Sequence, residues 1–437
     1  MSPHTSIVFL SGGGWVLKAL WLWVVRAVMY NTQIMRILYL QTFPFWGSGS
    51  GTYARHLASE VGRRHKVAIL APDTRPIERA KLYPVTLPFP VAFTGHPEWP
   101  DCKLYQNLTS EEIWEVYDTF LRATIKAVED FRPEIIHAHH AFPTAWLAAF
   151  IKDTYNINYV VTIHGSELPT LERDRRYWQR TFDAMYRAKA IYPNSGYTRD
   201  WFLRIFKGNF REKCKVIPGG VNIEKFIHSD SGAKDVDKSL NLHGKPVVVF
   251  AGKLTKYKGV EYLVGAAKNI HGEVVILGDG PERKSLEEKA KNLGLTNIHF
   301  IGHLGAGVKK LVPYYSRADV FVAPSVWDEP LGLVILESMA CGTPVVVTRK
   351  GGIPLAVKEG YNGFFVRPRN SSEIVEKVNK LLDNLSLRNK MGQNSRKSVE
   401  EKFSWTTIGG QFEQGYGKYA KKPNGTAPPP QVPTVKK

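Results

Sequence analysis

The chain has 437 residues, of which 43% are hydrophobic and 23% charged, a balance typical of globular domains and not of disordered chains. Its 59 lysines and arginines outweigh 40 acidic residues, and the net charge of +19 suits a polyanionic partner such as a nucleotide diphosphate, an anionic lipid surface or nucleic acid. Three scattered cysteines exclude a disulfide framework and a cysteine metal site, which indicates a reducing compartment such as the cytoplasm.

Residues 1–34 are predicted to be an N-terminal extension of the folded part. Trp15–Tyr30 is apolar apart from Lys18 and Arg26. One interpretation is an amphipathic helix on a membrane surface, because aromatic and basic side chains suit that interface. The other is a start codon read too far upstream, with Met35 as the true first residue. Two internal charges disfavour a membrane-spanning helix.

From Met35 onward, short β-branched runs alternate with longer helical patterns, which is typical of parallel sheets built from βαβ units. The first series of predicted strands is Ile37–Leu40, Val67–Leu70, Ile135–Ala138, Tyr159–Ile163 and Ile191–Tyr192. The second is Val247–Phe250, Val274–Leu277, Ile298–Ile301, Val320–Ala323, Val345–Thr348 and Phe364–Val366. The sequence therefore predicts an α/β protein with two doubly wound domains, 35–215 and 216–403.

Three segments lie outside this pattern. Phe226–Gly244 has little apolar content, so we interpret it as a linker or an exposed insertion. Residues 404–420 follow the second series of strands. Residues 421–437 are rich in proline and carry four lysines but no acid, which predicts a disordered tail.

A glycine-rich loop, Trp46–Tyr53, follows the first strand and opens a helix. Gly49 and Gly51 would let the backbone approach a phosphate or a sugar closely. The loop lacks the full dinucleotide fingerprint, and no Gly-Lys-Ser/Thr of the Walker type is present. This pattern disfavours dehydrogenases and P-loop enzymes.

Histidines gather at predicted strand ends. His164 is followed by Gly165 at the carboxyl end of a strand, which makes it a candidate for contact with a substrate. His137, His139 and His140 suggest a metal cluster at first sight, but strand alternation sends neighbours to opposite faces and no carboxylate completes the ligand set. We therefore predict core or cleft roles for them and no metal site.

Lys253 and Lys258 follow the strand that ends at Phe250, on either side of a turn that leads into a helix. Two cations so placed can converge on one diphosphate and stabilise the charge of a departing nucleotide. Loss of such a preorganised contact typically costs about 3 kcal/mol, or roughly a hundredfold in rate. Most lysines are solvated surface groups, and Lys256 is predicted to be one of them.

A strand ending near Ala323 leads into a turn with Glu329, and Pro330 stands where a helix can start. The backbone amides of Leu331, Gly332 and Leu333 would then form an anion site at the helix N-terminus. Glu337 on that helix could accept hydrogen bonds from ribose hydroxyls, and Glu329 from the hydroxyls of a sugar. Taken singly, each glutamate is better explained as an exposed helix-end charge, and it is the combination with the lysine motif that favours a donor site.

Together these motifs resemble family 4 of the retaining glycosyltransferases, which have the GT-B fold, over about Met35 to Tyr419. The most specific feature is the pair Glu329 and Glu337 with seven residues between them. His164-Gly165 matches the His-Gly pair of the family. Family members typically have an arginine where this chain has Lys253, so the charge is kept and the bidentate fork is lost.

The resemblance implies two Rossmann-like domains facing each other across a cleft, with the acceptor on 35–215, the donor on 216–403 and the helix at 404–420 crossing back. It implies His164 against the reacting sugar, Glu329 on that sugar, Lys253 and Lys258 on the diphosphate, and Glu337 on the ribose. Gly49, Gly51, the backbone near Leu304 and the amides of Leu331, Gly332 and Leu333 complete the implied donor site. His164, Glu329 and Lys258 are the candidate catalytic residues.

The implied activity is transfer of a sugar from a UDP- or GDP-sugar to a glycan, lipid or small-molecule acceptor, with retention of configuration. Neither a cofactor nor a metal ion is expected, because the lysines neutralise the leaving group. The expected location is the cytoplasm, with a peripheral contact at the inner membrane face.

Two other functions stay open at this point. A nucleotide-sugar 2-epimerase of related fold would need acid and base carboxylates in the first domain. A non-catalytic protein that binds sugar nucleotides or anionic membranes would have no turnover. Nucleic acid is not an expected partner, because no base-reading or base-stacking motif accompanies the charge.

Overall fold

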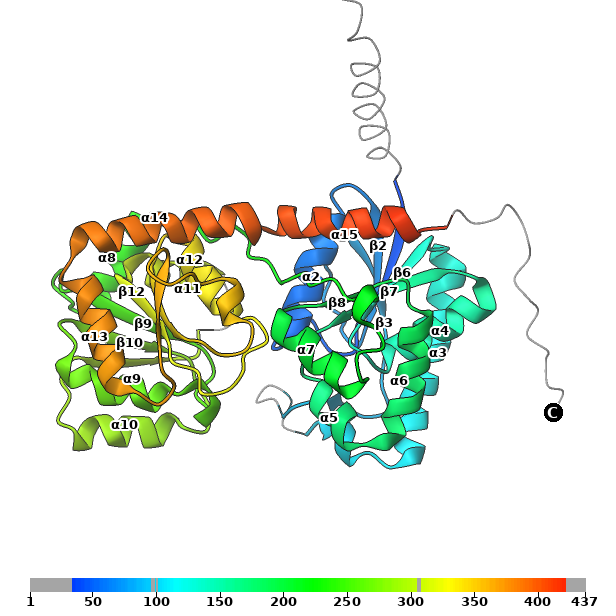
Figure 1. Ribbon diagram of the computed structural model, residues 1–437, viewed down its shortest axis with the longest axis horizontal. Coiled ribbons are helices and arrows are strands. Elements are labelled where there is room, and N and C mark those ends of the chain that lie inside the picture. The colour runs from blue at the N-terminus through cyan, green and yellow to red at the C-terminus, as the bar shows by residue number, and fades with distance from the viewer. Residues whose placement is uncertain (1–33, 96–98, 100, 305–307, 422–437) are drawn as a thin grey trace, which may run out of the picture.

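The computed structural model describes residues 34–95, 99, 101–304 and 308–421. They form two domains, each built around a six-stranded parallel sheet with helices on both faces (Figure 1). The first sheet contains β3 (Ala80–Pro84), β2 (Lys66–Ala71), β1 (Arg36–Leu40), β6 (Ile135–His139), β7 (Asn158–Ile163) and β8 (Ile191–Pro193), in that order. The second contains β11 (Ile298–Gly302), β10 (Glu273–Leu277), β9 (Val247–Ala251), β12 (Val320–Ala323), β13 (Val345–Thr348) and β14 (Gly363–Val366). The predicted doubly wound α/β class is confirmed.

The strands are recognisable in the sequence because helices cover both faces of each sheet. All five residues of β9 are buried, and their sequence is a continuous apolar run. A strand with one wet face would alternate polar and apolar residues instead. The expected strand positions therefore agree closely with the observed ones.

Helices connect the strands. The first domain contains α2 (Gly49–Val61), α3 (Ser110–Phe131), α4 (Thr144–Tyr155), α5 (Leu168–Arg173), α6 (Trp178–Arg187) and α7 (Gly196–Ile205). The second contains α8 (Asp230–Ser239), α9 (Val260–Ala266), α10 (Arg283–Asn292), α11 (Val308–Arg317), α12 (Leu333–Ala340), α13 (Ser371–Leu382) and α14 (Leu385–Lys402). Among the described residues, no helix combines the length and the apolar character needed to cross a bilayer.

The last helix, α15 (Trp405–Tyr419), continues the line of α14 along both domains and lies on the first one (Figure 1). Tyr416 is buried there, and its hydroxyl lies 3.0 Å from that of Tyr39 and 2.6 Å from Nδ1 of His137. The C-terminal helix therefore completes the core of the first domain and ties the two domains together.

The interpretation of Phe226–Gly244 as a linker or exposed insertion was wrong. It contains α8, whose Ser229 caps the helix by accepting from the Gly232 amide, and whose Val236 is buried. Arg317 of α11 donates to Asp237 at 2.8 Å. The helix was missed because one apolar side chain gives no helical periodicity.

Three strands were also missed. β3 lies at the edge of the first sheet, where its residues are half-buried or exposed and form no continuous apolar run. β4 (Val91–Ala92) pairs with β5 (Lys103–Leu104) in a small parallel ribbon beside the first sheet. A strand of two residues is too short to show a hydrophobic period.

In both sheets the strand order reverses at one point, between β1 and β6 in the first and between β9 and β12 in the second. Ligands of open α/β sheets bind in the crevice at the carboxyl ends of the strands beside such a switch point. The loops that leave these four strands therefore mark where a site is expected.

Candidate active site

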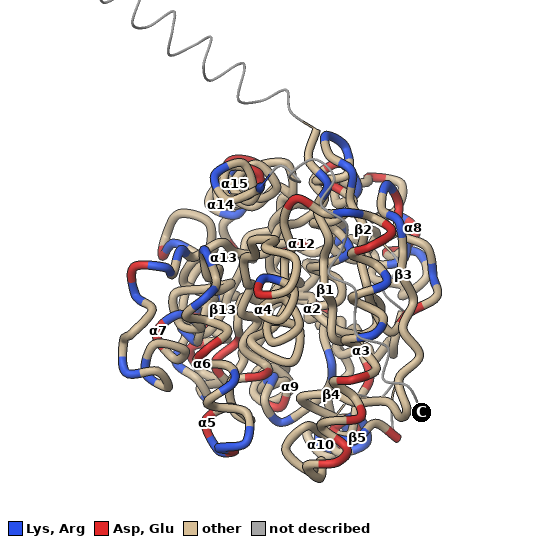
Figure 2. The backbone as a smooth tube through the Cα atoms, turned by 90° about the vertical axis from the view of Figure 1, so that its right-hand side faces the viewer, with Lys and Arg blue, Asp and Glu red and all other residues tan. Residues whose placement is uncertain are grey.

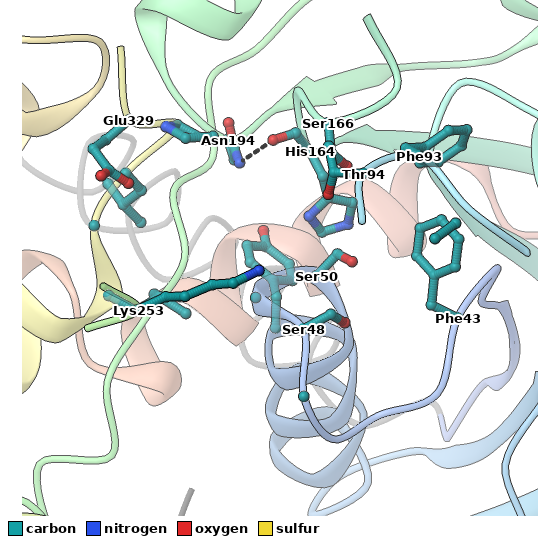
Figure 3. A pocket seen from close by; sticks show the side chains of 18 of the residues that line it. Phe43, Ser48, Ser50, Phe93, Thr94, His164, Ser166, Asn194, Lys253 and Glu329 are labelled. Atoms are coloured by element: carbon teal, nitrogen blue, oxygen red, sulfur yellow. Dashed lines mark hydrogen bonds between the residues drawn. The ribbon is translucent and has the colours of Figure 1, made fainter. Parts of the chain in front are cut away.

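A cavity of about 460 Å³ lies between the two domains, and the loops at both switch points line it. Its first-domain wall includes Phe43, Ser48, Gly49, Tyr53, Phe93, His164 and Asn194. Its second-domain wall includes Lys253, Lys258, Glu329, Leu331, Gly332, Leu333 and Val334. Most of the residues singled out in the sequence are thus brought together around one space, part of which Figure 3 shows.

Lys258 and Glu329 form an ion pair at the second-domain wall. Lys258 Nζ lies 2.5 Å from Glu329 Oε1, and the Ser325 hydroxyl donates to the same oxygen at 2.8 Å. The loops that carry these residues pack closely, because Gly259 has a positive φ of 64° and an added Cβ would lie 2.1 Å from the Pro324 carbonyl oxygen. A side chain at position 259 would therefore separate the lysine from its partner.

Lys253 extends from the second domain toward Ser48 and Ser50 at the start of α2 (Figure 3). Its Nζ donates to the carbonyl oxygen of Gly95, in the first domain, at 3.5 Å. Burial and the neighbouring charge of Lys258 both lower the pKa of Lys253. Two ammonium groups therefore share the cavity with one carboxylate, which leaves positive charge for an anionic ligand.

Helix α12 begins at Leu333, so the predicted start at Pro330 was wrong. Gly332 precedes it with φ 80°, a left-handed conformation that glycine adopts without strain. Leu331 and Gly332 thus belong to the loop, although both still line the cavity with Leu333 and Val334. The helix N-terminus opens on the cavity one turn later than expected.

Glu337 and Leu304 do not border the cavity. Glu337 is partly buried behind it, where it accepts a hydrogen bond from the Tyr315 hydroxyl at 3.0 Å. Burial raises the pKa of Glu337 to about 7. Leu304 packs against the core of the second domain. A nucleotide would have to extend beyond the enclosed cavity to reach these two residues.

The two glycines of the first loop have different roles. Gly49 lines the cavity, and nothing lies within 4 Å of an added Cβ. An added Cβ on Gly51 would lie 2.3 Å from the Pro44 carbonyl oxygen, so this glycine serves the packing of the loop. Ser48 caps α2 by accepting from the Gly51 amide at 3.0 Å. Of the pair, only Gly49 is placed at the cavity.

His164 stands at the end of β7 and lines the cavity with 5% of its surface exposed. Its Nε2 lies 3.0 Å from Nδ1 of His139, and its carbonyl oxygen accepts from the Asn194 side chain at 2.9 Å (Figure 3). Burial lowers the pKa of His164 to about 3. The imidazole is therefore neutral at physiological pH.

Behind His164 lies a carboxylate that the sequence interpretation missed. Glu167 has no exposed surface, and its Oε1 accepts from the backbone amide of His164 at 3.0 Å and from that of Ala141 at 3.3 Å. Burial raises the pKa of Glu167 to about 7. An acid three residues after a strand-end histidine was the signal available in the sequence.

The aromatic side of the cavity was also missed. Phe43 and Phe93 contact each other edge to face at 5.0 Å between ring centroids, and the ring of Tyr53 meets His164 in the same way at 5.0 Å.

Within the described residues, no three histidine, cysteine or acidic side chains are arranged to hold a metal ion.

Comparison with known proteins agrees with this architecture. Residues 47–225 match the family model described as Glycosyltransferase Family 4, and residues 233–398 match the one described as Glycosyl transferases group 1. An uncharacterized glycosyltransferase of Methanocaldococcus jannaschii, MJ1607, is 32% identical over 289 residues, which are 63% of this chain and 73% of that protein. Alpha-maltose-1-phosphate synthase of Mycolicibacterium smegmatis is 27% identical over 69% of this chain and 83% of that protein.

Solved structures show the same fold. Sucrose-phosphate synthase from Thermosynechococcus elongatus superimposes with a TM-score of 0.70 at 22% identity, over 88% of this chain and 98% of that one. Anabaena HepE in complex with UDP gives a TM-score of 0.70 at 20% identity, over 88% of this chain and all of that one, 100%. The two domains and their cleft are those of a GT-B glycosyltransferase. The chain belongs to the group 1 glycosyltransferases of family 4, a family of retaining enzymes.

Proposed function

We propose that this enzyme transfers a sugar from a UDP- or GDP-sugar to a glycan, lipid-linked or small-molecule acceptor in the interdomain cavity. The observation that carries the proposal is the convergence of Lys253, Lys258 and the start of α12 on one wall of that cavity. Ammonium groups and helix amides stabilise a pyrophosphate as its charge develops. HepE, solved with UDP, shares the fold and so supports the kind of donor.

In the proposed reaction, the bond between the anomeric carbon and the phosphate oxygen breaks, and the acceptor oxygen forms its bond to that carbon from the same face. The acceptor's proton passes to the departing phosphate, so no side chain has to act as the base. Lys258 donates hydrogen bonds to the leaving group, and Glu329 accepts hydrogen bonds from the sugar hydroxyls. Neutral His164 packs against the sugar and, without its charged imidazolium form, does not act as a general acid.

We propose that no divalent ion or cofactor takes part, because the two lysines supply the positive charge. Enzyme treated with EDTA is then expected to keep its activity, and a loss restored by Mg²⁺ or Mn²⁺ would contradict this.

A panel of UDP-, GDP- and ADP-sugars tests the donor. A ligand that binds only the folded protein at a hundred times its Kd stabilises it by about 2.7 kcal/mol, so the true donor raises the melting temperature most. The same donor is expected to be turned over in the presence of acceptor. If none of the panel shifts the melting temperature or is consumed, the proposal fails.

One structural observation disfavours the epimerase. Among the described residues that line the cavity, Glu329 is the one carboxylate, and it comes from the second domain. Epimerisation would convert the nucleotide-sugar into its epimer without an acceptor, whereas transfer requires one. Donor consumption with and without acceptor therefore separates the two reactions.

We also propose that the enzyme works in the cytoplasm and touches the inner face of a membrane peripherally. The charge of +19 supports an anionic surface as the partner, and the three cysteines are unpaired.

A further inference from the structure

Positive charge is concentrated in one stretch of the first domain. Residues 171–215 contain 12 lysines and arginines against 5 acids, whereas residues 35–170 contain 13 against 14. The basic stretch runs from the end of α5 through α6 and α7 to the connection that follows. Most of the net positive charge of the first domain therefore comes from this stretch, and the rest of the domain is close to neutral.

Four lysines gather where strands of the first sheet begin. Lys189 stands two residues before β8, Lys152 lies in the last turn of α4 before β7, and the Lys421 amide donates to the carbonyl oxygen of Glu134, the residue before β6. Lys213 Nζ donates to the carbonyl oxygen of Tyr186 at the end of α6. We call Lys152, Lys189, Lys213 and Lys421, together with Tyr186, the basic edge.

The basic edge holds like charges close together. Lys152 Nζ and Lys421 Nζ donate to the same oxygen, Oδ1 of Asn156, at 2.9 and 2.8 Å. Within the described part of the chain, none of its four ammonium groups is in an ion pair, since the nearby Asp153 pairs with Arg187. The charges of Lys421 and Lys189 add to burial in lowering the pKa of Lys152. An anionic partner would relieve this repulsion.

The position of the basic edge separates it from the active site. It lies at the amino ends of β6, β7 and β8, whereas the cavity lies at the carboxyl ends of the strands. Figure 2 looks onto this side of the molecule, with α4 near the centre, α15 above it and α6 below. A partner bound here leaves the cleft open.

Both ends of the described chain leave the domain at this edge. The Arg36 amide donates to Oε2 of Glu134 at 2.8 Å, and the Lys421 amide donates to its carbonyl oxygen at 3.0 Å. The sequence before residue 34 contains the apolar stretch Trp15–Tyr30, and residues 421–437 carry four lysines and no acid. Apolar and polybasic segments attached beside a basic surface suit a lipid bilayer better than a soluble polyanion.

We propose that the basic edge docks on an anionic lipid bilayer. Tyr186 is 69% exposed among the lysines, and tyrosine side chains favour the membrane interface. This assignment deepens the peripheral contact proposed above and is independent of sugar transfer.

The test is sedimentation of the full chain with vesicles of phosphatidylcholine, alone or with 30% phosphatidylglycerol. We expect binding to the anionic vesicles that weakens with salt, and little binding to the neutral ones. Each lysine near such a surface contributes about fivefold, so the triple variant Lys152→Gln, Lys189→Gln, Lys421→Gln should bind about a hundredfold more weakly.

The matched control removes the same charge from exposed positions of the second domain, with Lys284→Gln, Lys291→Gln and Lys390→Gln. It should change vesicle binding less than about twofold. Equal losses in both triple variants, or no loss in the first, would overturn the proposal.

Two further measurements distinguish the alternatives. If duplex DNA binds as tightly as the anionic vesicles and loses binding in the same variant, the edge is a general polyanion site and the membrane assignment is wrong. The melting temperature shift caused by the donor should be unchanged in the first triple variant. Failure of membrane binding is thereby separated from failure of the proposed donor site.

Discussion

The two walls of the cavity are built on the same fold but differ in chemistry. The second-domain wall presents Lys253, Lys258 and Glu329, whereas the first-domain wall presents neutral His164 among aromatic rings. Charged groups stabilise a leaving group whose charge grows during the reaction. Neutral and apolar groups position a sugar that has no charge. Under the proposed reaction, the second domain would stabilise the leaving group with its two lysines, and the sugar would lie between His164 of the first domain and Glu329 of the second.

The supporting residues follow the same division. The second-domain wall, which we call the lysine wall, is held in place by the ion pair between Lys258 and Glu329 and by close packing at Gly259. The first-domain wall, which we call the histidine wall, is held in place by buried polar contacts of His164 with Glu167 and His139. The lysine wall of the second domain therefore depends on charge, and the histidine wall of the first domain depends on burial.

The largest effect is expected from Lys258→Ala. The variant loses a preorganised cation and leaves Glu329 without its partner, so kcat/KM for sugar transfer should fall by about a hundredfold or more. The control is Lys256→Ala, whose side chain is exposed and does not line the cavity. If both variants lose activity equally, the lysine wall has no specific role.

A smaller effect is expected from His164→Ala. Loss of one packed contact with the sugar should lower the transfer rate by about tenfold, or ~1.4 kcal/mol. Because the pKa of His164 is about 3, the ratio of wild-type to variant rates should stay constant between about pH 5 and 8. A ratio that changes around neutrality would show that the imidazole transfers a proton, and the contrast between the walls would break down.

Glu167→Gln tests the burial on which the histidine wall depends. Its carboxyl has a pKa of about 7 in the folded protein against an ordinary value of 4.5, so the folded form favours the protonated group. Wild-type stability should thus fall from about pH 4.5 to 7 and stay lower above that, by up to about 3 kcal/mol.

Glutamine cannot ionise, and it can still accept from the two backbone amides. The variant should therefore gain stability relative to the wild type as the pH rises, which chemical denaturation at pH 5 and pH 8 measures. A stability difference that does not change with pH would show that Glu167 is charged in the folded protein.

The sequence predicted the strands of the two sheets better than it predicted the helix starts and loops around the cavity. Strands such as Val247–Ala251 are buried on both faces, so a continuous apolar run marks them. His164 and Lys258 were singled out because the first directly follows a strand, the second lies in the loop that leaves another, and both strands are readable in the sequence. Helix α8 was not, because it shows no apolar periodicity and its contact with Arg317 exists only in the tertiary structure, although Ser229 as a helix cap was a signal available in the sequence.

The same reason explains the errors within the site. The start of α12 depends on the left-handed Gly332, which does not follow from Pro330 alone. Phe93 lines the cavity directly after the two-residue strand β4. A strand this short shows no hydrophobic period, so the position of Phe93 was not predicted. Gly51 resembled a ligand contact because sequence does not distinguish space for a ligand from close packing against Pro44.

The smallest effect is expected from Lys253→Arg, which tests how Lys253 contributes to the lysine wall. Arginine restores the bidentate fork for a phosphate and keeps its charge at any pH of interest. We expect KM for the donor to fall by about two- to fivefold, with kcat nearly unchanged. Since burial and Lys258 lower the pKa of Lys253, the advantage of arginine should grow as the pH rises. A higher KM would instead show that the contact with Gly95 leaves no room for the larger guanidinium, and that the narrowness of the cleft at this point selects lysine.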